Sequence, residues 1–397
     1  MSQNVFSTST ITLSKSAVRQ NVRFVKSKLA NNVLLSAVLK GNAYGHGIKE
    51  MVPLFESAGV KHLSVFSIQE AAQVCQVKKQ STAIMIMGWM EDEETEWAIE
   101  NDVEFYVFEI GRLKAALDFA KKLGKKAKIH VEVETGMNRT GFQEEHLEEV
   151  MAMMKENEEF IEFEGLCTHY AGAESITNYL RVMDQIKKYQ HICDIFKANG
   201  LVPKRRHTAC SAAAMSYPET QMDMVRIGIL LYGFWPSQET FIAYQRSNGY
   251  GQEGISRRVK HPLKRVISWR SKIMSVKEVP VGEFIGYGTS YQATKKMKIA
   301  TVPVGYAYGF ARSLSNQGRV IVNGKRVAVI STVNMNLMIV NVTECKNVGK
   351  GDEVIMIGSN ANGKVNVTVA SFGELSNQLN YELLSRLPMD IPRKVVI

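Results

Sequence analysis

The stretch VLLSAVLKGNAYGHG (33–47) joins an apolar, strand-like run to a lysine and a glycine-rich turn. Seven more apolar or β-branched runs follow before about residue 235, and helix-length amphipathic segments such as 111–123 and 176–198 separate most of them. This alternation is typical of repeated βα units and a parallel sheet. In chain order the seven runs are HLSVFS (62–67), TAIMIM (82–87), VEFYVF (103–108), KIHVEVE (128–134), FEGLCTH (163–169), RRHTAC (205–210) and MVRIGILLYG (224–233).

Eight such strands fit a (β/α)8 barrel better than an open doubly wound sheet. After Pro236 the helical periodicity disappears, and short strand-like runs such as GRVIVNG (318–324) and DEVIMIG (352–358) follow one another with Gly or Asn between them. We therefore predict an α/β protein with a TIM-type (β/α)8 barrel over residues 14–240. A mostly β C-terminal domain over 241–397, joined by the N-terminal strand 1–13, should follow, with 245–262 as a linker or surface insertion.

The composition of the chain excludes several classes of protein. Its 397 residues, 45% hydrophobic and 22% charged, suit two folded domains rather than a disordered chain. No apolar block has the length of a signal peptide or a membrane span, so we expect a cytoplasmic protein without a membrane partner. Five scattered cysteines lack metal-ligand spacing, which predicts free thiols and no metal site.

A net charge of +10 and the basic stretch 257–277 are the features that favour a nucleic-acid partner. No aromatic or glycine-rich recognition pattern accompanies them, so a solvated basic face explains them as well. We expect no nucleic-acid binding.

Polar side chains collect where the predicted barrel strands end, which is where barrels carry their active sites. Lys40 closes the first strand. Burial there would lower the pKa of its amine, as a Schiff-base lysine requires, although a lysine that merely extends to solvent from a strand end is the ordinary alternative. The fifth run continues into ETGMNRTGF, the sixth ends at His169, the seventh at Ser211, and the eighth carries Arg226 and Gly228.

The segment AVLKGNAYGHG (37–47) resembles the pyridoxal-phosphate lysine motif of the alanine racemase family. Eight further blocks resemble that family's motifs in the same order and extend over essentially the whole chain. The resemblance implies a pyridoxal-phosphate barrel followed by a β domain, which agrees with the pattern above. The blocks are VETGMNRTGF (133–142), THYAGAE (168–174), HTACSAAA (207–214), VRIGILLYG (225–233), GYGTSY (286–291), VGYAYGF (304–310), NMNLMIVNVT (334–343) and LNYELLSR (379–386).

The activity implied is the interconversion of L- and D-alanine, which supplies D-alanine for peptidoglycan. The cofactor, pyridoxal 5'-phosphate, is the electron sink that makes the α-proton removable. By resemblance Lys40 carries the cofactor as a Schiff base and is the base on one face of the substrate. Tyr287 is the base on the other face and comes from the β domain of a second subunit, so the resemblance implies a homodimer with shared sites.

The other site residues also carry over by resemblance. Arg226 contacts the pyridine nitrogen, and because a guanidinium cannot give up its proton, this contact disfavours a fully developed carbanion. His169 and His207 lie behind Arg226, although each alone would more often be a satisfied core histidine. The phosphate donors are Tyr44, Ser211, the Gly228 and Ile229 amides, and Tyr381. The substrate carboxylate is bound by Arg139 and the Met335 amide with Tyr306 nearby, and Glu174 and Arg312 line the entrance.

Departures from the family's commoner pattern leave the substrate open. Cys210 stands where family members often have asparagine, and Asn336 and Tyr308 where they often have aspartate, so a racemase of broad specificity is the alternative to an alanine racemase. A non-catalytic cofactor carrier would lack Tyr287 and the β domain. A decarboxylase of the same architecture would carry a cysteine-bearing loop and a glycine triplet that are not found.

Glu132 is a further departure. Many family members have at this position a lysine that can be carbamylated, so that it presents an anion to the arginine matching Arg139. Residues two apart on a strand face the same way, so Glu132 and Glu134 should project together. We expect Glu132 to be a built-in carboxylate that replaces the carbamate and hydrogen-bonds Arg139. An ordinary surface glutamate is the alternative.

Overall fold

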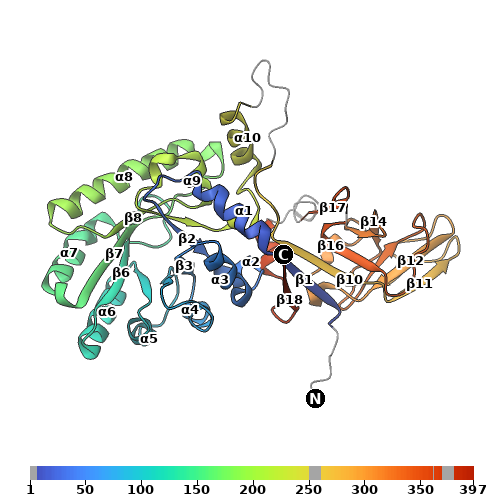
Figure 1. Cartoon of the computed structure of the whole chain (residues 1–397), viewed down its shortest axis with the longest axis horizontal. Helices are drawn as coiled ribbons and strands as arrows, with labels where there is room; N and C mark the ends of the chain where they lie inside the picture. The colour runs from blue at the N-terminus through green and yellow to red at the C-terminus, as the bar shows by residue number, and fades with distance from the viewer. Residues whose placement is uncertain (1–6, 250–260, 361, 369–379) are drawn as a thin grey trace. The chain divides into compact units, whose positions relative to one another are not determined.

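The computed structural model describes residues 7–249, 261–360, 362–368 and 380–397. Two compact units make up the chain (Figure 1). One comprises residues 17–40 and 51–264 and holds the parallel sheet. The other comprises residues 1–16, 41–50 and 265–397 and holds the antiparallel strands.

The first unit is an eight-stranded, nearly closed parallel barrel, which confirms the predicted fold class. Neighbouring strands pair in the order β8-β7-β6-β5-β4-β3-β2-β9. The Asp223 amide donates to the Arg206 carbonyl at 3.1 Å and the Arg226 amide to the Ala209 carbonyl at 2.9 Å, which brings the two ends of the sheet together. The strands are β2 (Leu34–Val38), β3 (His62–Val65), β4 (Ala83–Ile86), β5 (Glu104–Val107), β6 (Ala127–Glu132), β7 (Ile161–Cys167), β8 (Arg205–His207) and β9 (Met224–Ile227).

Helices cover the outside of these strands (Figure 1). Both helical segments singled out in the sequence are confirmed as α6 (Ile110–Leu123) and α8 (Tyr179–Ala198). Glu109 caps the start of helix α6, because its side chain accepts from the Gly111 amide, and left-handed Gly124 caps its end, as glycine commonly does. The other helices of this unit are α1 (Lys15–Lys26), α3 (Ile48–Ser57), α4 (Ile68–Cys75), α5 (Glu94–Glu100), α7 (Leu147–Glu156), α9 (Ser211–Ser216) and α10 (Gln238–Ser247).

Helix α10 lies in a region where the sequence predicted no helix, so the statement that helical periodicity ends at Pro236 is wrong. Ser237 caps the helix, because its hydroxyl accepts from the Thr240 amide at 3.1 Å. Of the segment predicted as a linker or surface insertion, 245–262, residues 245–247 form the end of this helix. Residues 250–260 of that segment lie outside the described part of the chain.

The second unit is a ten-stranded, mostly antiparallel sheet, as the sequence predicted for the C-terminal half. Its long path runs β11-β12-β15-β14-β13-β16-β10-β1-β18, and β17 pairs with β16. The N-terminal strand β1 (Ser9–Ser14) lies between β10 and β18, pairing antiparallel with the first and parallel with the second. The remaining strands are β10 (Ile267–Lys272), β11 (Ser275–Val279), β12 (Met297–Val302), β13 (Arg319–Val322), β14 (Lys325–Ile330), β15 (Met338–Asn341), β16 (Glu353–Ser359), β17 (Asn366–Val367) and β18 (Arg393–Val396).

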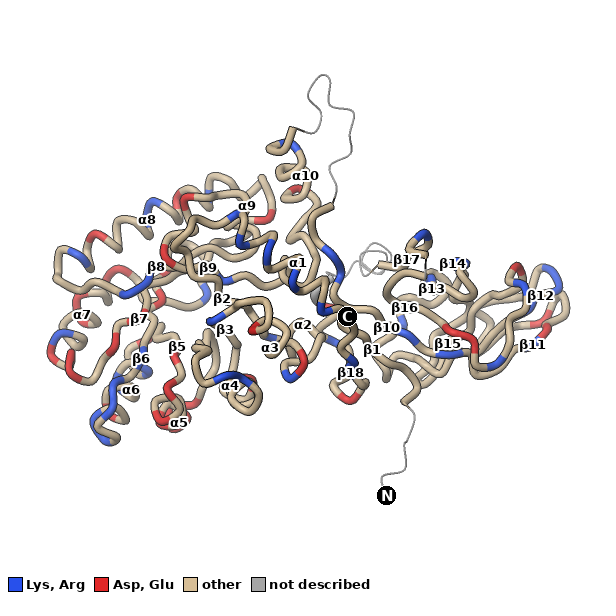
Figure 2. Tube along the Cα trace, viewed as in Figure 1, with Lys and Arg blue, Asp and Glu red and all other residues tan. Residues whose placement is uncertain are grey.

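Charged residues of both signs are interspersed along the chain, including its outer helices (Figure 2). The described part of the basic stretch 257–277 includes strand β10, where Arg270 pairs with Glu353 at 2.7 Å. Within the described residues, no helix combines the length and the apolar character needed to cross a membrane.

Candidate active site

Lys40 follows the first barrel strand directly, and the Leu39 amide before it donates to the Ser64 carbonyl of the next strand at 2.8 Å. Lys40 is exposed in the single chain. Even so, desolvation by the surrounding protein lowers the pKa of its amine, and the positive charges of Arg139 and Arg226 lower it further. A lysine that loses its proton readily can act as a nucleophile and as a base.

The turn after Lys40 has an unusual backbone. Gly41, Asn42, Ala43 and Tyr44 all adopt left-handed angles, with φ between 51° and 65°. For each residue other than glycine this conformation costs about 1–2 kcal/mol. The Ile48 amide donates to the Asn42 side-chain oxygen at 3.0 Å, and this contact holds the turn. A turn of this kind places Tyr44, one of the predicted phosphate donors, at a defined point of the chain.

Arg226 on β9 is buried, and its position is defined by hydrogen bonds. Its Nη1 donates to the His207 carbonyl at 2.7 Å and to the His207 ring nitrogen Nδ1. Its Nη2 donates to the Thr168 carbonyl at 2.7 Å and to the Thr208 carbonyl at 3.2 Å. These bonds use four of the five N–H groups of a guanidinium. The fifth, on Nε, has no hydrogen-bond partner among the described residues and is available to a ligand.

The two predicted histidines lie close to this arginine and are held neutral. Desolvation by burial lowers the pKa of His169 to about 3, and the charges of Arg226, Arg139 and Lys40 act in the same direction. Burial and the charge of Arg226 also place the pKa of His207 well below its usual range. The structure therefore brings Lys40, His169, His207 and Arg226 together at one end of the barrel.

Ser211, Gly228 and Ile229 also meet in this unit. The Gly228 amide donates to the Ser211 hydroxyl at 3.1 Å, which joins the start of α9 to the end of β9. Ile229 then begins the short helix η5 (Ile229–Tyr232). Backbone amides and a hydroxyl at such a turn are the donors that a phosphate group needs.

Arg139 lies in a loop that one carboxylate organises. Glu134 accepts from the amides of Gly136, Met137, Asn138 and Arg139, the second of these at 2.7 Å. Burial alone would raise the pKa of Glu134, but the backbone amides hold it below the usual value. The Arg139 side chain is exposed, and it has no hydrogen bond or ion pair within the described residues. It is free to bind an anion.

The predicted site residues of the β unit are exposed in the single chain. Tyr287 is 78% exposed, Met335 55% and Tyr306 42%. The backbone brings Tyr306 and Met335 together, because the Tyr306 amide donates to the Asn334 carbonyl and the Ala307 amide to the Met335 carbonyl, each at 3.0 Å. Tyr381 belongs to helix α12 (Asn380–Ser385), but its side chain lies outside the described part of the structure.

Two family models cover most of the chain. The model for the alanine racemase N-terminal domain matches residues 13–236, and that for the alanine racemase C-terminal domain matches residues 266–395. The chain belongs to the alanine racemase family. The predicted family and enzyme class, an isomerase, are thereby confirmed.

Individual members of the alanine racemase family are similar over nearly their whole length. An alanine racemase from Leptospira interrogans is 33% identical over 386 residues, which is 97% of this chain and 95% of that protein. The solved alanine racemase from Clostridium difficile 630 is 29% identical with a TM-score of 0.88, covering 99% of this chain and 97% of that one. A Bartonella henselae alanine racemase described with covalently bound pyridoxal phosphate is 23% identical with a TM-score of 0.81, covering 98% of this chain and all of that one, and supports the fold alone.

The departures from the alanine racemase pattern lie in both units. Cys210 directly precedes helix α9, in the same unit as Lys40. Tyr308 ends the short helix η6 (Tyr306–Tyr308) and Asn336 is exposed. Of the two residues predicted to line the entrance, Glu174 accepts from the Ser237 hydroxyl through its carbonyl at 2.5 Å, and Arg312 begins the short helix η7 (Arg312–Leu314).

Glu132 is buried at the end of β6, so the ordinary surface glutamate is excluded. The predicted hydrogen bond between Glu132 and Arg139 is not present, because no ion pair or hydrogen bond joins these described residues. The Arg139 side chain extends to solvent instead, and Glu134 binds the loop amides rather than projecting with Glu132. Desolvation raises the pKa of Glu132, while Thr140 and the charges of Arg226 and Arg139 lower it in part. Glu132 therefore interacts with Arg139 electrostatically and without a hydrogen bond.

Three polar residues inside the barrel were missed by the sequence analysis. His62, Glu104 and His130 are buried, and each histidine hydrogen-bonds the carboxylate of Glu104. The signal was available, since each of them is a polar residue that begins or interrupts a strand-like run, in HLSVFS, VEFYVF and KIHVEVE respectively. Polar residues on a buried strand need partners, and their occurrence on β3, β5 and β6 of the same barrel points to a network.

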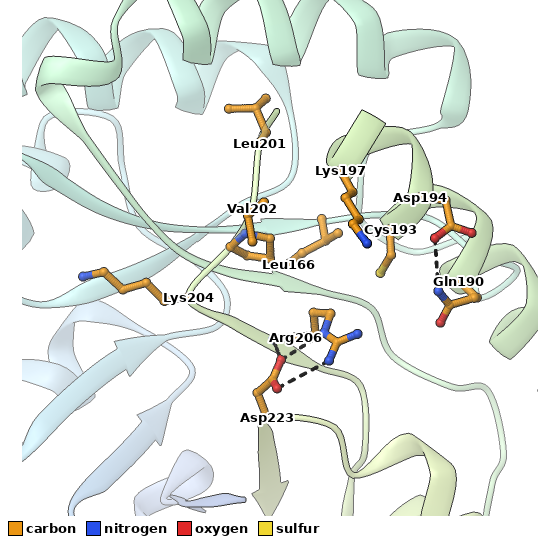
Figure 3. Close-up of a pocket in the computed structure, with 11 residues that line it drawn as sticks. Leu166, Gln190, Cys193, Asp194, Lys197, Leu201, Val202, Lys204, Arg206 and Asp223 are labelled. Atoms are coloured by element: carbon orange, nitrogen blue, oxygen red, sulfur yellow. Dashed lines mark hydrogen bonds and ion pairs between the residues drawn. The ribbon is translucent and has the colours of Figure 1, made fainter. Parts of the chain in front are cut away.

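One cavity of about 410 Å³ lies away from these residues (Figure 3). It is lined by α8 and by residues at the amino ends of β8 and β9, where Arg206 pairs with Asp223 at 3.0 Å. Lys40 lies instead at the carboxyl end of β2. Since functional sites of such barrels lie at the carboxyl ends of the strands, this cavity is not the candidate active site. No group of three or more metal-ligating side chains occurs among the described residues.

Proposed function

We propose that this protein interconverts L- and D-alanine, with pyridoxal 5'-phosphate bound covalently to Lys40. The observation that carries the proposal is the arrangement of Lys40 and Arg226 in the barrel unit. The amine of Lys40 has a lowered pKa, and the nearby Arg226 has one N–H group, on Nε, that the protein does not use. Lys40, Arg139 and Arg226 together form a cationic surrounding. Such a surrounding suits a phosphorylated cofactor and a substrate that carries a carboxylate.

The residues of the barrel fit the cofactor. Nε of Arg226 would donate to the pyridine nitrogen, and Ser211 with the Gly228 and Ile229 amides would hold the phosphate, together with Tyr44 and Tyr381. His169 and His207 would lie behind Arg226. When bound, pyridoxal phosphate supplies the electron sink that makes the proton on the α-carbon removable.

Proton transfer at the α-carbon is assigned to Lys40 on one face and to Tyr287 on the other. A tyrosine has an ordinary pKa of about 10, so nearby cations and hydrogen bonds are needed for it to act as a base. Tyr287 is largely exposed in the single chain. This exposure supports a homodimer in which Tyr287 of one subunit completes the site on the barrel of the other.

Substrate binding is assigned to three residues. Arg139 would bind the substrate carboxylate together with the Met335 amide, and Tyr306 would lie nearby. The product, D-alanine, would supply peptidoglycan synthesis in the cytoplasm. We assign cofactor binding to a domain of residues 14–240, and Tyr287 to a domain of residues 241–397 that includes the strand 1–13.

A racemase of broad specificity is the second candidate, and the departures at Cys210, Tyr308 and Asn336 favour it. Two carboxylates of the commoner pattern are replaced by neutral side chains at the last two positions. This change lowers the negative charge near the entrance, so that larger or differently charged amino acids would be less strongly excluded.

The test is a racemisation assay across a panel of L-amino acids, with and without pyridoxal phosphate. Deuterium incorporation at the α-carbon in D2O is measured in parallel, because it reports proton removal directly. We expect alanine to be inverted with the highest kcat/KM and to exchange its α-proton. An α-proton exchanged for no amino acid would overturn the racemase proposal, while a higher kcat/KM for several other amino acids would favour the broad enzyme.

A further inference from the structure

A continuous chain of buried hydrogen bonds leads away from Arg226 through the interior of the barrel. His207 contacts Arg226 through Nδ1, and its Nε2 lies 2.8 Å from Nδ1 of His130. Nε2 of His130 lies 2.7 Å from a carboxylate oxygen of Glu104. All four side chains are buried.

The donors and acceptors of this chain can be ordered in only one direction. A guanidinium can only donate, so Nδ1 of His207 must accept and the proton of that ring must be on Nε2. Nε2 of His207 then donates to Nδ1 of His130, whose own proton is on Nε2. That proton is donated to Glu104, and an ionised carboxylate can only accept. The chain therefore runs from a cation to an anion through two neutral imidazoles.

The charges of the rings agree with this order. Burial lowers the pKa of His130 and places that of His207 well below its usual range, so both rings stay neutral. Although burial alone would raise the pKa of Glu104, hydrogen bonds from His130 and His62 hold it far below the usual value. Arg205, 3.4 Å from the same carboxylate, adds a positive charge at that end.

The backbone is adapted to the contact between the two rings. Gly165 on β7 lies beside it, and a Cβ atom built there would stand 2.1 Å from Nδ1 of His130 and 2.7 Å from Nε2 of His207. Gly165 is not in a left-handed conformation, so its backbone does not require glycine. The absence of a side chain is what leaves room for the hydrogen bond.

Among the partners of Arg226, only His207 can change its role. The other partners are the carbonyls of His207, Thr168 and Thr208, which always accept. A histidine ring can move its proton from Nε2 to Nδ1, and a proton on Nδ1 would face an N–H group of Arg226. Something must therefore hold the ring proton of His207 on Nε2, and the acceptor at the far end of the chain can do this.

We propose that Glu104 is a positioning residue for Arg226, acting through His130 and His207, and that its carboxylate keeps His207 as a hydrogen-bond acceptor. The proposal deepens the proposed function and rests on it, because Arg226 matters to catalysis only if it meets the cofactor. Without the acceptor at Glu104, the ring protons of His130 and His207 could move from Nε2 to Nδ1. Arg226 would then lose its hydrogen bond to Nδ1 of His207 and shift from its position.

The first test needs no variant. Holoenzyme is prepared with 15N-labelled histidine, and NMR distinguishes protonated from unprotonated ring nitrogens. A scalar coupling between two ring nitrogens across an N–H···N bond identifies the His130–His207 pair. We expect both rings to be neutral, with the proton on Nε2, from pH 6 to pH 8. A proton on Nδ1 of His207, or on both of its nitrogens, would overturn the proposal.

The second test cuts the chain at two points and compares each variant with a matched control. Glu104→Leu removes the acceptor, whereas Glu104→Gln keeps an acceptor oxygen but removes the charge. Gly165→Ala places a methyl group against the hydrogen bond between His130 and His207 without changing any charge. Glu164→Gln is the control, because Glu164 is also buried and also pairs with Arg205, at 3.1 Å, but contacts neither histidine.

We expect Glu104→Leu and Gly165→Ala to lower kcat for alanine on the order of 10–100-fold, the range for residues that orient another functional group. The KM for alanine should change little, since Arg139 is not in the chain. Glu104→Gln should fall between Glu104→Leu and the control, and Glu164→Gln should resemble wild type in kcat and in the NMR spectrum.

Equal losses of kcat in Glu104→Leu and Glu164→Gln would overturn the positioning role, because they would indicate a general effect of a buried carboxylate. Failure of wild type to racemise any amino acid would instead overturn the proposed function. The NMR measurement separates the two, since the direction of the hydrogen bonds is observed whether or not the protein turns over a substrate.

Discussion

The barrel and the β unit present their candidate site residues in opposite ways. In the barrel, Arg226 donates four hydrogen bonds and is buried, and desolvation lowers the pKa of Lys40. In the β unit, Tyr287 is 78% exposed and Met335 55%. Arg226 is held in place before any ligand binds, whereas Tyr287 and Met335 of the β unit stand open to solvent.

Part of the proposed site is therefore preorganised in the single chain, and part of it is exposed. A preorganised set of charges costs no rearrangement at the moment of reaction, and the barrel supplies such a set. Exposed aromatic and methionine side chains are instead typical of surfaces that another protein covers. We expect the largest effect at Lys40 in the barrel and the next largest at Tyr287, in the proposed subunit contact. Smaller effects are expected for the left-handed backbone, the buried histidines and the electrostatic influence of Glu132.

The largest effect is expected for Lys40→Ala. This change removes the only covalent attachment point that we assign to the cofactor, so racemisation and borohydride-trapped pyridoxal phosphate should be lost together. Mass spectrometry of the reduced protein measures the second quantity. Cofactor that is still trapped on the variant after reduction would contradict the role of Lys40.

The second prediction concerns the exposed Tyr287. Lys40→Ala and Tyr287→Phe should each be inactive, but a mixed dimer holds one site with both wild-type residues. After random subunit exchange, about a quarter of all sites should be intact, because half of the dimers are mixed and one of their two sites is complete. Exchange is verified with subunits of different mass. No recovered activity despite exchange would exclude shared sites.

The third prediction compares a glycine in each unit. Gly45 is left-handed, and a Cβ there would lie 1.8 Å from the Leu384 carbonyl oxygen. Gly45→Ala should therefore cost about 2–5 kcal/mol, from the left-handed backbone and the overlap together. Gly124→Ala is the control, because Gly124 is also left-handed but has nothing within 4 Å of the added Cβ. It should cost only about 1–2 kcal/mol. Equal losses in denaturant unfolding would show that the Leu384 contact relaxes.

The fourth prediction is a loss of stability in mild acid. Burial lowers the pKa of His169 in the barrel to about 3 and that of His46 in the β unit to about 4. Their stabilising contribution is complete above the unfolded-state pKa of about 6.5 and is lost as the pH falls below it. Each should contribute a slope of at most about 1.4 kcal/mol per pH unit. Denaturant midpoints between pH 7 and pH 5 measure it, and His169→Gln should reduce the slope. A slope that is unchanged in that variant would show that His169 is protonated in the folded protein.

The smallest effect is expected for Glu132→Gln. Because Glu132 acts on Arg139 without a direct contact, the change should raise the KM for alanine only several-fold, or about 1 kcal/mol, as for partly screened charge pairs. Bicarbonate should leave the wild-type activity unchanged, since no carbamate is needed. A wild-type KM in the variant, or inactivation of the native enzyme when carbon dioxide is removed, would contradict this role.

The sequence predicted the fold well because the barrel depends on a repeated local signal. Each of the eight strand-like runs became a barrel strand, and the segments 111–123 and 176–198 became helices. Helix α10 was not predicted because its apolar periodicity is weak. Thr240 is the only buried residue of this helix among those described. Its cap at Ser237 was the better signal.

The candidate site was predictable only in part. The segment around Lys40 carries a motif, but the motif does not display the left-handed backbone of residues 41–44 or their membership of the β unit. The bond between His130 and His207 joins residues 77 apart, and a local pattern gives no sign of it. The separation of Glu132 from Arg139 depends on the path of the loop that Glu134 organises.

The β unit is discontinuous along the chain, and this has a consequence for how the protein can be dissected. Its sheet needs strand β1 from the N-terminus, and the Arg393 side chain donates to the Gly45 carbonyl at 2.9 Å. A fragment that begins at residue 265 would leave one edge of β10 and β18 without its neighbour. The complementary fragment would keep β1 and the turn after Lys40 with nothing to pair against. Expression of the two halves as separate modules would therefore expose strand edges and favour aggregation, whereas a circular permutant that leaves these segments joined to their sheet would keep both units whole.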